Sequence, residues 1–349
     1  MEMQLEKNKF KQTEISGIPE GWSATILKDV AVVNEKAIDK KYPHTEIEYI
    51  DIASVDKGRV LEIRRLLRSE APSRAQRIVR DRDILLSTVR PNLKHFAFMK
   101  TANSSTIAST GFAVISSKII NPRFLYYYLT TDKYTDYLSA IADAHTSTYP
   151  AFNPDILENS EIPFPPENEQ RTIAKILSDL DEKIELNHQM NKTLEQIAQA
   201  IFKRWFVDFE FPGYEKGKFT NGIPQGWREG NLVDTCEIVM GQSPPGETYN
   251  ESGEGIVFYQ GNRDFGFRFP APRVYCTAPT RIAEAGDVLI SVRAPVGALN
   301  ITLGQCAVGR GVAALRMKHY SNGFLFYFLL TQNDLWSRYN SEGTVFGCL

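Results

Sequence analysis

The chain has 349 residues, 42% of them hydrophobic, and a net charge of −2, which fits two folded domains with a connector and excludes a disordered chain. No apolar run approaches the about 20 residues of a membrane span, and the charged N-terminal residues do not resemble a signal peptide. The four cysteines form no C-x-x-C pair, so we expect reduced thiols and a cytoplasmic protein that contacts no membrane.

A short sequence near the N-terminus occurs twice. Gly-Ile-Pro-Glu-Gly-Trp at 17–22 returns as Gly-Ile-Pro-Gln-Gly-Trp at 222–227. Three further segments match in the same order, namely 83–91 with 287–295, 110–114 with 310–314, and 124–129 with 324–329. The offset of about 200 residues far exceeds the about 20–50 residues of a solenoid repeat. The sequence therefore predicts two tandem copies of one domain, in residues 1–152 and 211–349.

Each copy combines short β-type runs with short helices. Strands are predicted at the apolar runs 84–89, 112–115, 288–292 and 312–315, and helices at the aromatic-rich runs 124–128 and 324–328. This pattern favours α+β domains over alternating βαβ units. We expect the aromatic side chains of these helices to pack in cores rather than to stack on bases.

A spacer at 153–210 separates the two copies, and most of it is predicted to be one helix. Residues from about 168 to 206 contain no Gly or Pro, and a helix of that length would extend about 58 Å, which suggests a coiled-coil partner. Asn187 and Asn191 either lie in its apolar seam or are exposed, because Met190 offers a second seam. The seam residues, which we expect to dock other subunits, are Ile173, Leu177, Leu180, Ile184, Leu194, Ala198, Ile201 and Trp205.

Basic residues are concentrated in one part of each copy. Between residues 57 and 100 there are twelve Lys or Arg and four Asp or Glu, and between 262 and 310 there are six Arg and three acids. The first stretch predicts contact with the phosphates of nucleic acid, because only local charge is felt beyond a Debye length. The alternative is a solvated surface whose charges have partners on neighbouring elements. For the second stretch both readings stay open.

Candidate base-reading residues stand near predicted strand ends and in glycine-containing loops. Arg and Lys suit guanine, whereas Asn and Gln suit adenine. The candidates are Arg64, Arg65, Arg68, Ser87, Arg90, Asn92 and Lys94 in the first copy, and Gln260, Asn262, Arg263, Ser291, Arg293 and Arg310 in the second. Ser87 with Ser291, and Arg90 with Arg293, form the two pairs that we favour.

Each of these choices has a structural alternative. The serines would cap turns, and the arginines would pair with Asp83 or Asp287. Two later polar loops, at 146–148 and 343–344, either contact phosphate or are simple turns.

Other chemistry finds little support in the sequence. The G-x-G-x-x-A pattern at 309–314 precedes a β-type run, so we expect a turn rather than a nucleotide site. The Ser-Pro-Pro-Gly run at 243–246 lacks the aromatic residue of an amino-methyltransferase motif. The five histidines have no ligand spacing, and no Walker A sequence is present. We therefore expect no catalytic residue, metal or cofactor in this chain.

Taken together, the motifs resemble one protein family. They are the repeated Gly-Ile-Pro-x-Gly-Trp, an Asp-[Ile/Val]-Leu-[Leu/Ile]-Ser strand in each copy, Pro-Pro-x-x-Glu-Gln at 165–170, and the Phe-Lys-x-Trp-Phe-Val-Asp-Phe run at 202–209. Over essentially its whole length the chain resembles the specificity subunit of type I restriction–modification systems. That resemblance implies a non-catalytic reader of double-stranded DNA. Each copy would be a target-recognition domain that reads one half of a split site, and the helix would set the gap.

The resemblance also implies partners. Two modification subunits would supply S-adenosylmethionine and N6-adenine methylation, and restriction subunits would supply ATP- and magnesium-dependent cleavage. Two other classes stay open, namely a protein–protein scaffold without base readout and a stand-alone methyltransferase or nuclease.

The second copy departs from the family pattern. Some 56 residues, the counterpart of 151–206, do not follow it in this sequence. We expect a form that is C-terminally shortened relative to the family, whose helix seam self-associates or binds the modification subunits. The length of the helix would allow half-sites separated by up to about 17 base pairs at about 3.4 Å each.

Overall fold

The computed structural model describes residues 10–13, 15, 17–145, 150–220 and 222–341. Internal contacts divide the chain into two compact units, Met1–His188 and Gln189–Leu349, and we describe each by itself. Among the described residues, no helix is both long enough and apolar enough to cross a bilayer. Cys236, Cys276 and Cys306 are buried free thiols.

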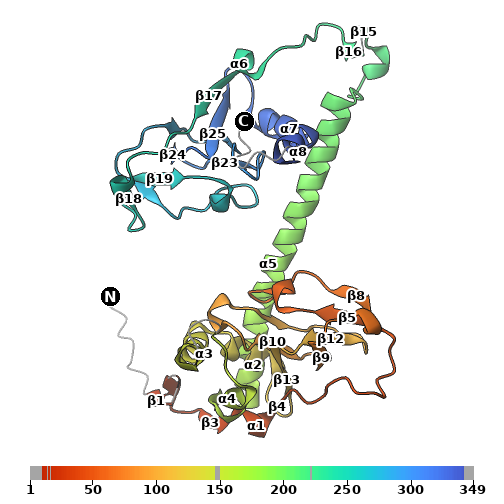
Figure 1. Cartoon of the computed structure of the whole chain (residues 1–349), viewed down its shortest axis with the longest axis vertical. Helices are drawn as coiled ribbons and strands as arrows, with labels where there is room; N and C mark the ends of the chain where they lie inside the picture. The colour runs from red at the N-terminus through yellow and green to blue at the C-terminus, as the bar shows by residue number, and fades with distance from the viewer. Residues whose placement is uncertain (1–9, 14, 16, 146–149, 221, 342–349) are drawn as a thin grey trace. The chain divides into compact units, whose positions relative to one another are not determined.

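The first unit is built on two four-stranded sheets (Figure 1). The order β11-β10-β13-β4 forms one sheet, and β8-β5-β12-β9 forms the other, in which β5 and β12 run parallel. The strands of these sheets are β4 (Ala31–Val33), β5 (Glu46–Ile50), β8 (Arg64–Leu67), β9 (Ala75–Ile78), β10 (Ile84–Ser87), β11 (Phe96–Phe98), β12 (Thr106–Ser109) and β13 (Phe112–Ser117).

Smaller elements complete the first unit. Its short strands are β1 (Phe10–Gln12), β2 (Gly17–Pro19), β3 (Ser23–Ile26), β6 (Val55–Asp56), β7 (Arg59–Val60) and β14 (Glu161–Phe164). Its helices before residue 160 are α1 (Leu27–Val30), α2 (Pro122–Leu129), α3 (Asp132–His145) and α4 (Pro154–Asn159).

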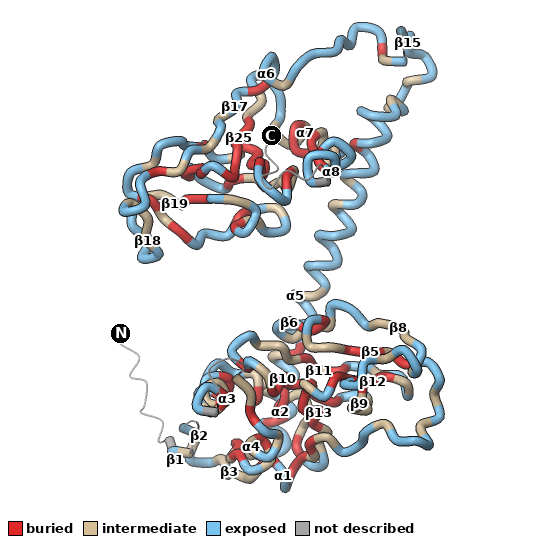
Figure 2. Tube along the Cα trace, viewed as in Figure 1, coloured by how far each residue is buried: buried red, intermediate tan, exposed pale blue. Residues whose placement is uncertain are grey.

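The β10 strand shows why this sequence forms a central strand. All four of its residues are buried, because Ile84 and Leu86 pack in one apolar cluster while Leu85 packs in another. A strand covered on both faces reads as a continuous apolar run rather than as an alternating one. Phe124 and Leu125 of α2 are buried in the first of these clusters, which confirms that the aromatic run belongs to the core (Figure 2).

The second unit repeats the arrangement. Its sheets have the orders β17-β25-β22-β23 and β18-β20-β19-β24-β21, and here β19 and β24 are the parallel pair. The strands are β17 (Cys236–Met240), β18 (Tyr249–Asn250), β19 (Ile256–Tyr259), β20 (Tyr275–Cys276), β21 (Ile282–Ala283), β22 (Val288–Ser291), β23 (Leu299–Ile301), β24 (Cys306–Val308) and β25 (Val312–Met317). The hairpin β15 (Phe219–Thr220) and β16 (Ile223–Pro224) comes before them, and the helices are α6 (Leu232–Thr235), α7 (Asn322–Leu330) and α8 (Asn333–Ser341).

Strand register confirms that the two copies share one fold. Ser87 pairs with Phe112 in the first unit, and Ser291 pairs with Val312 in the second. The predicted α+β class is correct, and the four predicted strands are β10, β13, β22 and β25. Residues 154–164, which the sequence assigned to the spacer, instead pack in the first unit. Leu157 and Ile162 are buried there, and β14 pairs with β3.

The predicted long helix is α5 (Glu167–Phe202), followed by a π-helical turn at Lys203–Val207. In the first unit it attaches through Ala174, which is buried, and through Asp181, which accepts a 2.7 Å hydrogen bond from the Tyr127 hydroxyl. In the second unit, Glu195 forms an ion pair with Arg268, and the ring of Phe202 lies 5.1 Å from that of Phe324.

The predicted seam is only partly used in these attachments. Ile173 and Leu177 are half-buried and Ala198 is intermediate, whereas Leu180, Ile184, Leu194, Ile201 and Trp205 are exposed. Asn187 and Asn191 are exposed as well. Each unit therefore contacts a face of α5 that includes carboxylates, and most of the apolar seam stays open among the described residues.

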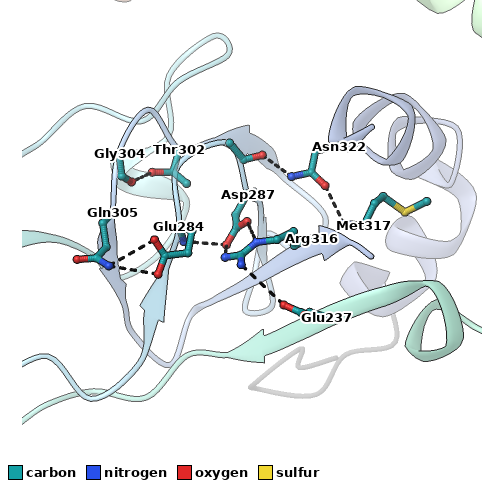
Figure 3. A network of polar contacts seen from close by, with 10 residues as sticks. Glu237, Glu284, Asp287, Thr302, Gly304, Gln305, Arg316, Met317 and Asn322 are labelled. Atoms are coloured by element: carbon teal, nitrogen blue, oxygen red, sulfur yellow. Dashed lines mark hydrogen bonds and ion pairs between the residues drawn. The ribbon is translucent and has the colours of Figure 1, made fainter. Parts of the chain in front are cut away.

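A polar network surrounds buried Asp287 in the second unit (Figure 3). Asp287 is buried and accepts hydrogen bonds of 2.6 and 2.9 Å from Nε and Nη2 of Arg316. This bonding raises the pKa of Arg316 further above its usual value. The sequence alternative that paired Asp287 with Arg293 is therefore wrong, because Arg316 of β25 occupies that role.

In the first copy, a hydroxyl stands where the second copy has the guanidinium that binds the buried carboxylate. Asp83 corresponds to Asp287, and Ser116 stands where the second copy has Arg316. The Ser116 hydroxyl donates to Asp83 at 2.6 Å, and the Arg80 amide donates at 2.8 Å. Burial raises the pKa of Asp83 above its usual value.

Removal of the Arg316 side chain is expected to destabilise the second unit. Arg316→Ala leaves Asp287 buried without its cation, and because Arg316 is itself partly exposed we expect a loss of about 2–3 kcal/mol, below that of a fully buried pair. Thermal and urea unfolding of the whole chain would measure it. The double variant Asp287→Asn/Arg316→Met should recover much of the loss, and a double variant less stable than Arg316→Ala would contradict this account.

Candidate nucleic-acid interface

The loops of the second unit meet at one end of its two sheets. Tyr259 of β19 lies beside Val308 of β24 in a parallel register, so both strands leave the sheet at the same end. The amide of Gly309 donates to the Tyr259 carbonyl oxygen at 2.9 Å. Gln260 and Arg310, the next residues outward, are both exposed.

Arg310 lies on a turn, as the sequence predicted for the G-x-G-x-x-A pattern. Its Nε donates a 3.1 Å hydrogen bond to the Ser243 hydroxyl. Gly311 follows, where a Cβ atom would overlap the carbonyl oxygen of Gln260. Only glycine permits this close approach, which holds Gln260 next to the turn that carries Arg310.

The remaining candidates of the second copy lie on adjoining loops. The Val292 amide donates to the Gly311 carbonyl oxygen at 3.0 Å, which brings the loop with exposed Arg293 to the same end. Asn262 and Arg263 lie on a 3-10 turn after β19 and are exposed.

Buried Asp264 holds this turn in place. It accepts from the Gln260 amide at 2.9 Å and pairs with Arg273 at 2.9 Å. Within the described ranges, Arg263 and Arg293 have no ion pair and no side-chain hydrogen bond.

The two favoured serines have structural roles. Ser291 is fully buried, and its hydroxyl donates to the Pro295 carbonyl oxygen at 2.7 Å and accepts from the Ala298 amide at 2.9 Å. Ser87 is also buried, and it donates to the Val89 carbonyl oxygen at 2.8 Å. Both hydroxyls face the turn that follows their strand, so the structure favours the turn-capping alternative for them.

The first copy carries different groups at the matching end. Ile50 of β5 lies beside Ala108 of β12 in the parallel register, so Asp51 stands where the second copy has Gln260. Thr110 likewise stands where the second copy has Arg310. The Asp51 carboxylate is engaged by Ser54 and Arg64. The two ends therefore share a backbone frame and differ in the side chains they offer.

Arg90, Asn92 and Lys94 follow β10 in the first copy. Arg90 and Asn92 are exposed, and the Arg90 amide donates to the Pro150 carbonyl oxygen at 2.8 Å. Lys94 lies 2.6 Å from Asp132, which holds the pKa of that carboxyl below its usual value.

The pairing of Arg90 with Arg293 is not exact. Ser87 and Ser291 occupy equivalent positions in the two copies. Counting along the chain from them, Arg90 is equivalent to Ala294, and Val89 is equivalent to Arg293. The two arginines therefore lie on equivalent loops but not at equivalent positions.

Most of the basic stretch in the first copy is paired. Arg64 binds Asp51 and lies over the Tyr49 ring, and Arg68 donates to two backbone carbonyls. Arg65 is weakly paired, 3.5 Å from Glu48, and its side chain is 83% exposed. These contacts favour the alternative in which neighbouring elements supply partners for the charges.

One exposed cation of this stretch lies near Thr110, at the end of the sheet that corresponds to the Arg310 end of the second copy. Arg74 is exposed, and its carbonyl oxygen accepts from the Thr110 amide at 2.8 Å, which places it at the end where Thr110 lies. The sequence placed Arg74 only within the basic stretch. A further residue that the sequence missed, Gln242, donates its backbone amide to Val308, two residues before Arg310 in the second copy.

Two other expectations concern sites elsewhere. The polar loops 146–148 and 343–344 lie outside the described residues. Across the part of the chain that the structure describes, no group of three or more His, Cys, Asp or Glu is arranged to hold a metal ion.

The chain matches known proteins over most of its length. Residues 19–196 match the family model of the type I restriction modification DNA specificity domain. The type I restriction enzyme MjaX specificity subunit of Methanocaldococcus jannaschii is 31% identical over 93% of this chain and 79% of that protein. The type I restriction enzyme HindI specificity subunit of Haemophilus influenzae is 31% identical over 66% of this chain and 49% of that protein.

A solved structure supports the fold. The type I restriction–modification system S subunit from M. genitalium aligns with 93% of this chain and 81% of its own, with a TM-score of 0.55 and 17% identity.

The structural role of Ser291 gives a test that separates packing from base contact. Ser291→Ala removes one donor and leaves the Ala298 amide without its acceptor, so we expect a loss of about 1–2 kcal/mol in unfolding free energy. The DNA sequence preference of the chain in its complex should not change. Unfolding and DNA selection would be measured on the same preparation. A changed preference at unchanged stability would contradict the structural role.

Proposed function

The chain belongs to the family of type I restriction–modification DNA specificity proteins, and we propose that it selects the DNA sequence on which such a complex acts. Each unit would read one half of a split site in double-stranded DNA. The observation that carries this proposal is the group of exposed residues at one end of the sheets of the second unit. They are Gln260, Asn262, Arg263, Arg293 and Arg310.

These side chains have the chemistry that base edges require. A guanidinium donates a fork of hydrogen bonds to O6 and N7 of guanine, and an amide both donates to and accepts from adenine. The residues lie on loops whose backbones hydrogen-bond to one another, such as Gly309 to Tyr259 and Val292 to Gly311. A rigid frame under exposed donors reduces the ordering cost of binding.

The two half-sites should differ in sequence. The matching ends of the two units carry Gln260 and Arg310 in one copy, and Asp51 and Thr110 in the other. For the first half-site we propose Arg90, Asn92 and Arg74, which are exposed donors on loops of the first unit. A chain with two unlike readers would recognise an asymmetric site.

We assign the partner contacts to α5. Large apolar side chains, each 44–59% exposed, lie along this helix. We call them the exposed stripe, and they are Ile176, Leu180, Ile184, Met190, Leu194, Ile197 and Ile201. Exposed apolar surface of this extent marks a protein interface. We propose that two modification subunits bind here and that restriction subunits join them in the cytoplasm. A second copy of the chain is the competing occupant of the stripe.

In this proposal the chain itself catalyses nothing. S-adenosylmethionine would bind the modification subunits, and ATP and magnesium would bind the restriction subunits. The alternative is a protein–protein scaffold without base readout. It makes a different prediction for Gln260, Asn262, Arg263, Arg293 and Arg310, which we call the reading end, because their removal would leave the DNA preference unchanged.

Removal of Arg310 is expected to relax one position of the second half-site. Arg310→Ala should reduce discrimination there by about 1–3 kcal/mol, because a forked contact to guanine is lost. Sequencing of methylated sites in a host that carries the whole system would measure it. Arg228→Ala is the matched control, since Arg228 is also exposed. Arg228 lies before the first residue of β17, whereas the loop that contacts Arg310 follows its last residue. An Arg310→Ala site identical to that of the parent chain would contradict base reading.

A longer α5 is expected to widen the gap between half-sites. Four residues inserted between Leu186 and Met190 would lengthen α5 by about 6 Å and add about 40° of right-handed rotation along it. Two added base pairs lengthen the DNA by about 7 Å, and the DNA helix is also right-handed. The gap should therefore grow by one or two base pairs while both half-sites keep their sequences. The control is a variant with four alanine substitutions in the same part of α5, which keeps the length of the helix unchanged. A gap that stays constant after insertion would exclude α5 as the spacer.

A further inference from the structure

The loop after β17 reaches the same end of the second unit as the residues proposed to read bases. The Gly241 amide donates to the Val312 carbonyl oxygen at 3.0 Å, and the Gln242 amide donates to the Val308 carbonyl oxygen at 3.0 Å. Two successive backbone bonds therefore attach this loop to the ends of β24 and β25. It lies directly against the turn that carries Arg310.

Close packing at Gly241 makes this attachment rigid. A Cβ atom there would overlap the carbonyl oxygens of both Gly309 and Val312. On its far side, the loop is held by the Tyr249 hydroxyl, which donates to the Pro244 carbonyl oxygen at 2.8 Å. Pro244 is buried. The loop from 241 to 245 is thus fixed at both ends, unlike a surface loop that must be ordered on binding.

Within this fixed loop, Gln242 and Ser243 have different surroundings. The Ser243 hydroxyl accepts from Nε of Arg310 at 3.1 Å, which leaves both terminal nitrogens of the guanidinium available for a forked contact. The Gln242 side chain is exposed, and its side-chain amide has no hydrogen-bond partner within the described ranges. Ser243 bonds the arginine, and the next residue along the same loop, Gln242, has an exposed side chain.

We propose that Gln242 is a specificity-determining residue that contacts an adenine next to the guanine contacted by Arg310, and that Ser243 positions Arg310 for that contact. This inference rests on the proposed function. The amide of Gln242 would accept from N6 and donate to N7 of the adenine, the pairing that suits glutamine in a major groove. In the first copy the segment after β4 takes another course, because Lys36 and Ile38 form backbone hydrogen bonds with β9. The Gln242 contact would therefore belong to the second half-site alone.

The test uses the whole restriction–modification complex and a DNA library in which the second half-site is randomised. Gln242→Ala should lower the preference for adenine at one position by about 5- to 150-fold and leave the first half-site unchanged. Gln242→Glu should move the preference at that position from adenine towards cytosine, because a carboxylate accepts from N4 of cytosine. Gln225→Ala, an exposed glutamine on the segment before α6, is the matched control. Melting temperature and complex assembly are measured for every variant.

Parallel variants separate the two levels of the argument. If Arg310→Ala changes the second half-site and Gln242→Ala does not, the inference about Gln242 fails and the proposed function holds. A uniform loss of affinity for all sequences by Gln242→Ala also overturns the inference, since that result indicates a phosphate or packing role. If neither variant changes the preference, the proposed reading end itself is wrong. For Ser243→Ala, we expect weakened discrimination at the Arg310 position alone, and Ser243→Thr should restore it.

Discussion

Close backbone packing at the end of the parallel strand pair β19 and β24 is the constraint on which the reading end of the second unit depends. Loops from β17, β19, β22 and β24 all meet there, and main-chain hydrogen bonds join them to one another. Glycines at 241 and 311 permit this because a Cβ at either would overlap a carbonyl oxygen. Gln260, Arg293 and Arg310 are exposed on this frame, and exposed side chains on a fixed backbone are what a recognition surface requires.

The same backbone constraint is present in both copies, although their exposed side chains differ. In the first copy the parallel pair is β5 and β12, and the register repeats that of the second copy. The side chains at its end have changed, and one of them, Asp51, has been taken up by Ser54 and Arg64. Divergence at a few loop positions therefore alters the donors and acceptors without changing the frame. A duplicated domain of this kind can acquire an asymmetric recognition site by substitution alone.

Some features of this protein could be predicted from the sequence, and others could not, for identifiable physical reasons. The strands β10, β13, β22 and β25 and the helix α5 follow from continuous apolar runs and from the lack of Gly and Pro. The sequence left two roles open for Ser87 and Ser291, because a buried hydroxyl that bonds its own turn looks the same in sequence as an exposed one. Arg64 and Arg68 read as free charge because their partners, Asp51 and two backbone carbonyls, are distant in sequence. Gln242 belongs to no repeated segment, so only the backbone bonds to β24 and β25 bring it into view.

The residues through which α5 contacts each domain differ from those of its exposed stripe. Tyr127 and Tyr327 are equivalent in the repeat, and each hydroxyl bonds a carboxylate of α5 within its own unit, Asp181 in one and Glu195 in the other. Glu195 is largely buried with Arg268, whose guanidinium lies 4.3 Å from the centre of the Phe326 ring. A helix of a globular domain normally buries its apolar face and exposes its charges. Here Asp181 and Glu195 contact the domains beside Ala174 and Phe202, while the leucine, isoleucine and methionine side chains of the exposed stripe face water. An apolar stripe left in water costs free energy in the isolated chain, and it is the arrangement expected of a helix with an interface for another protein.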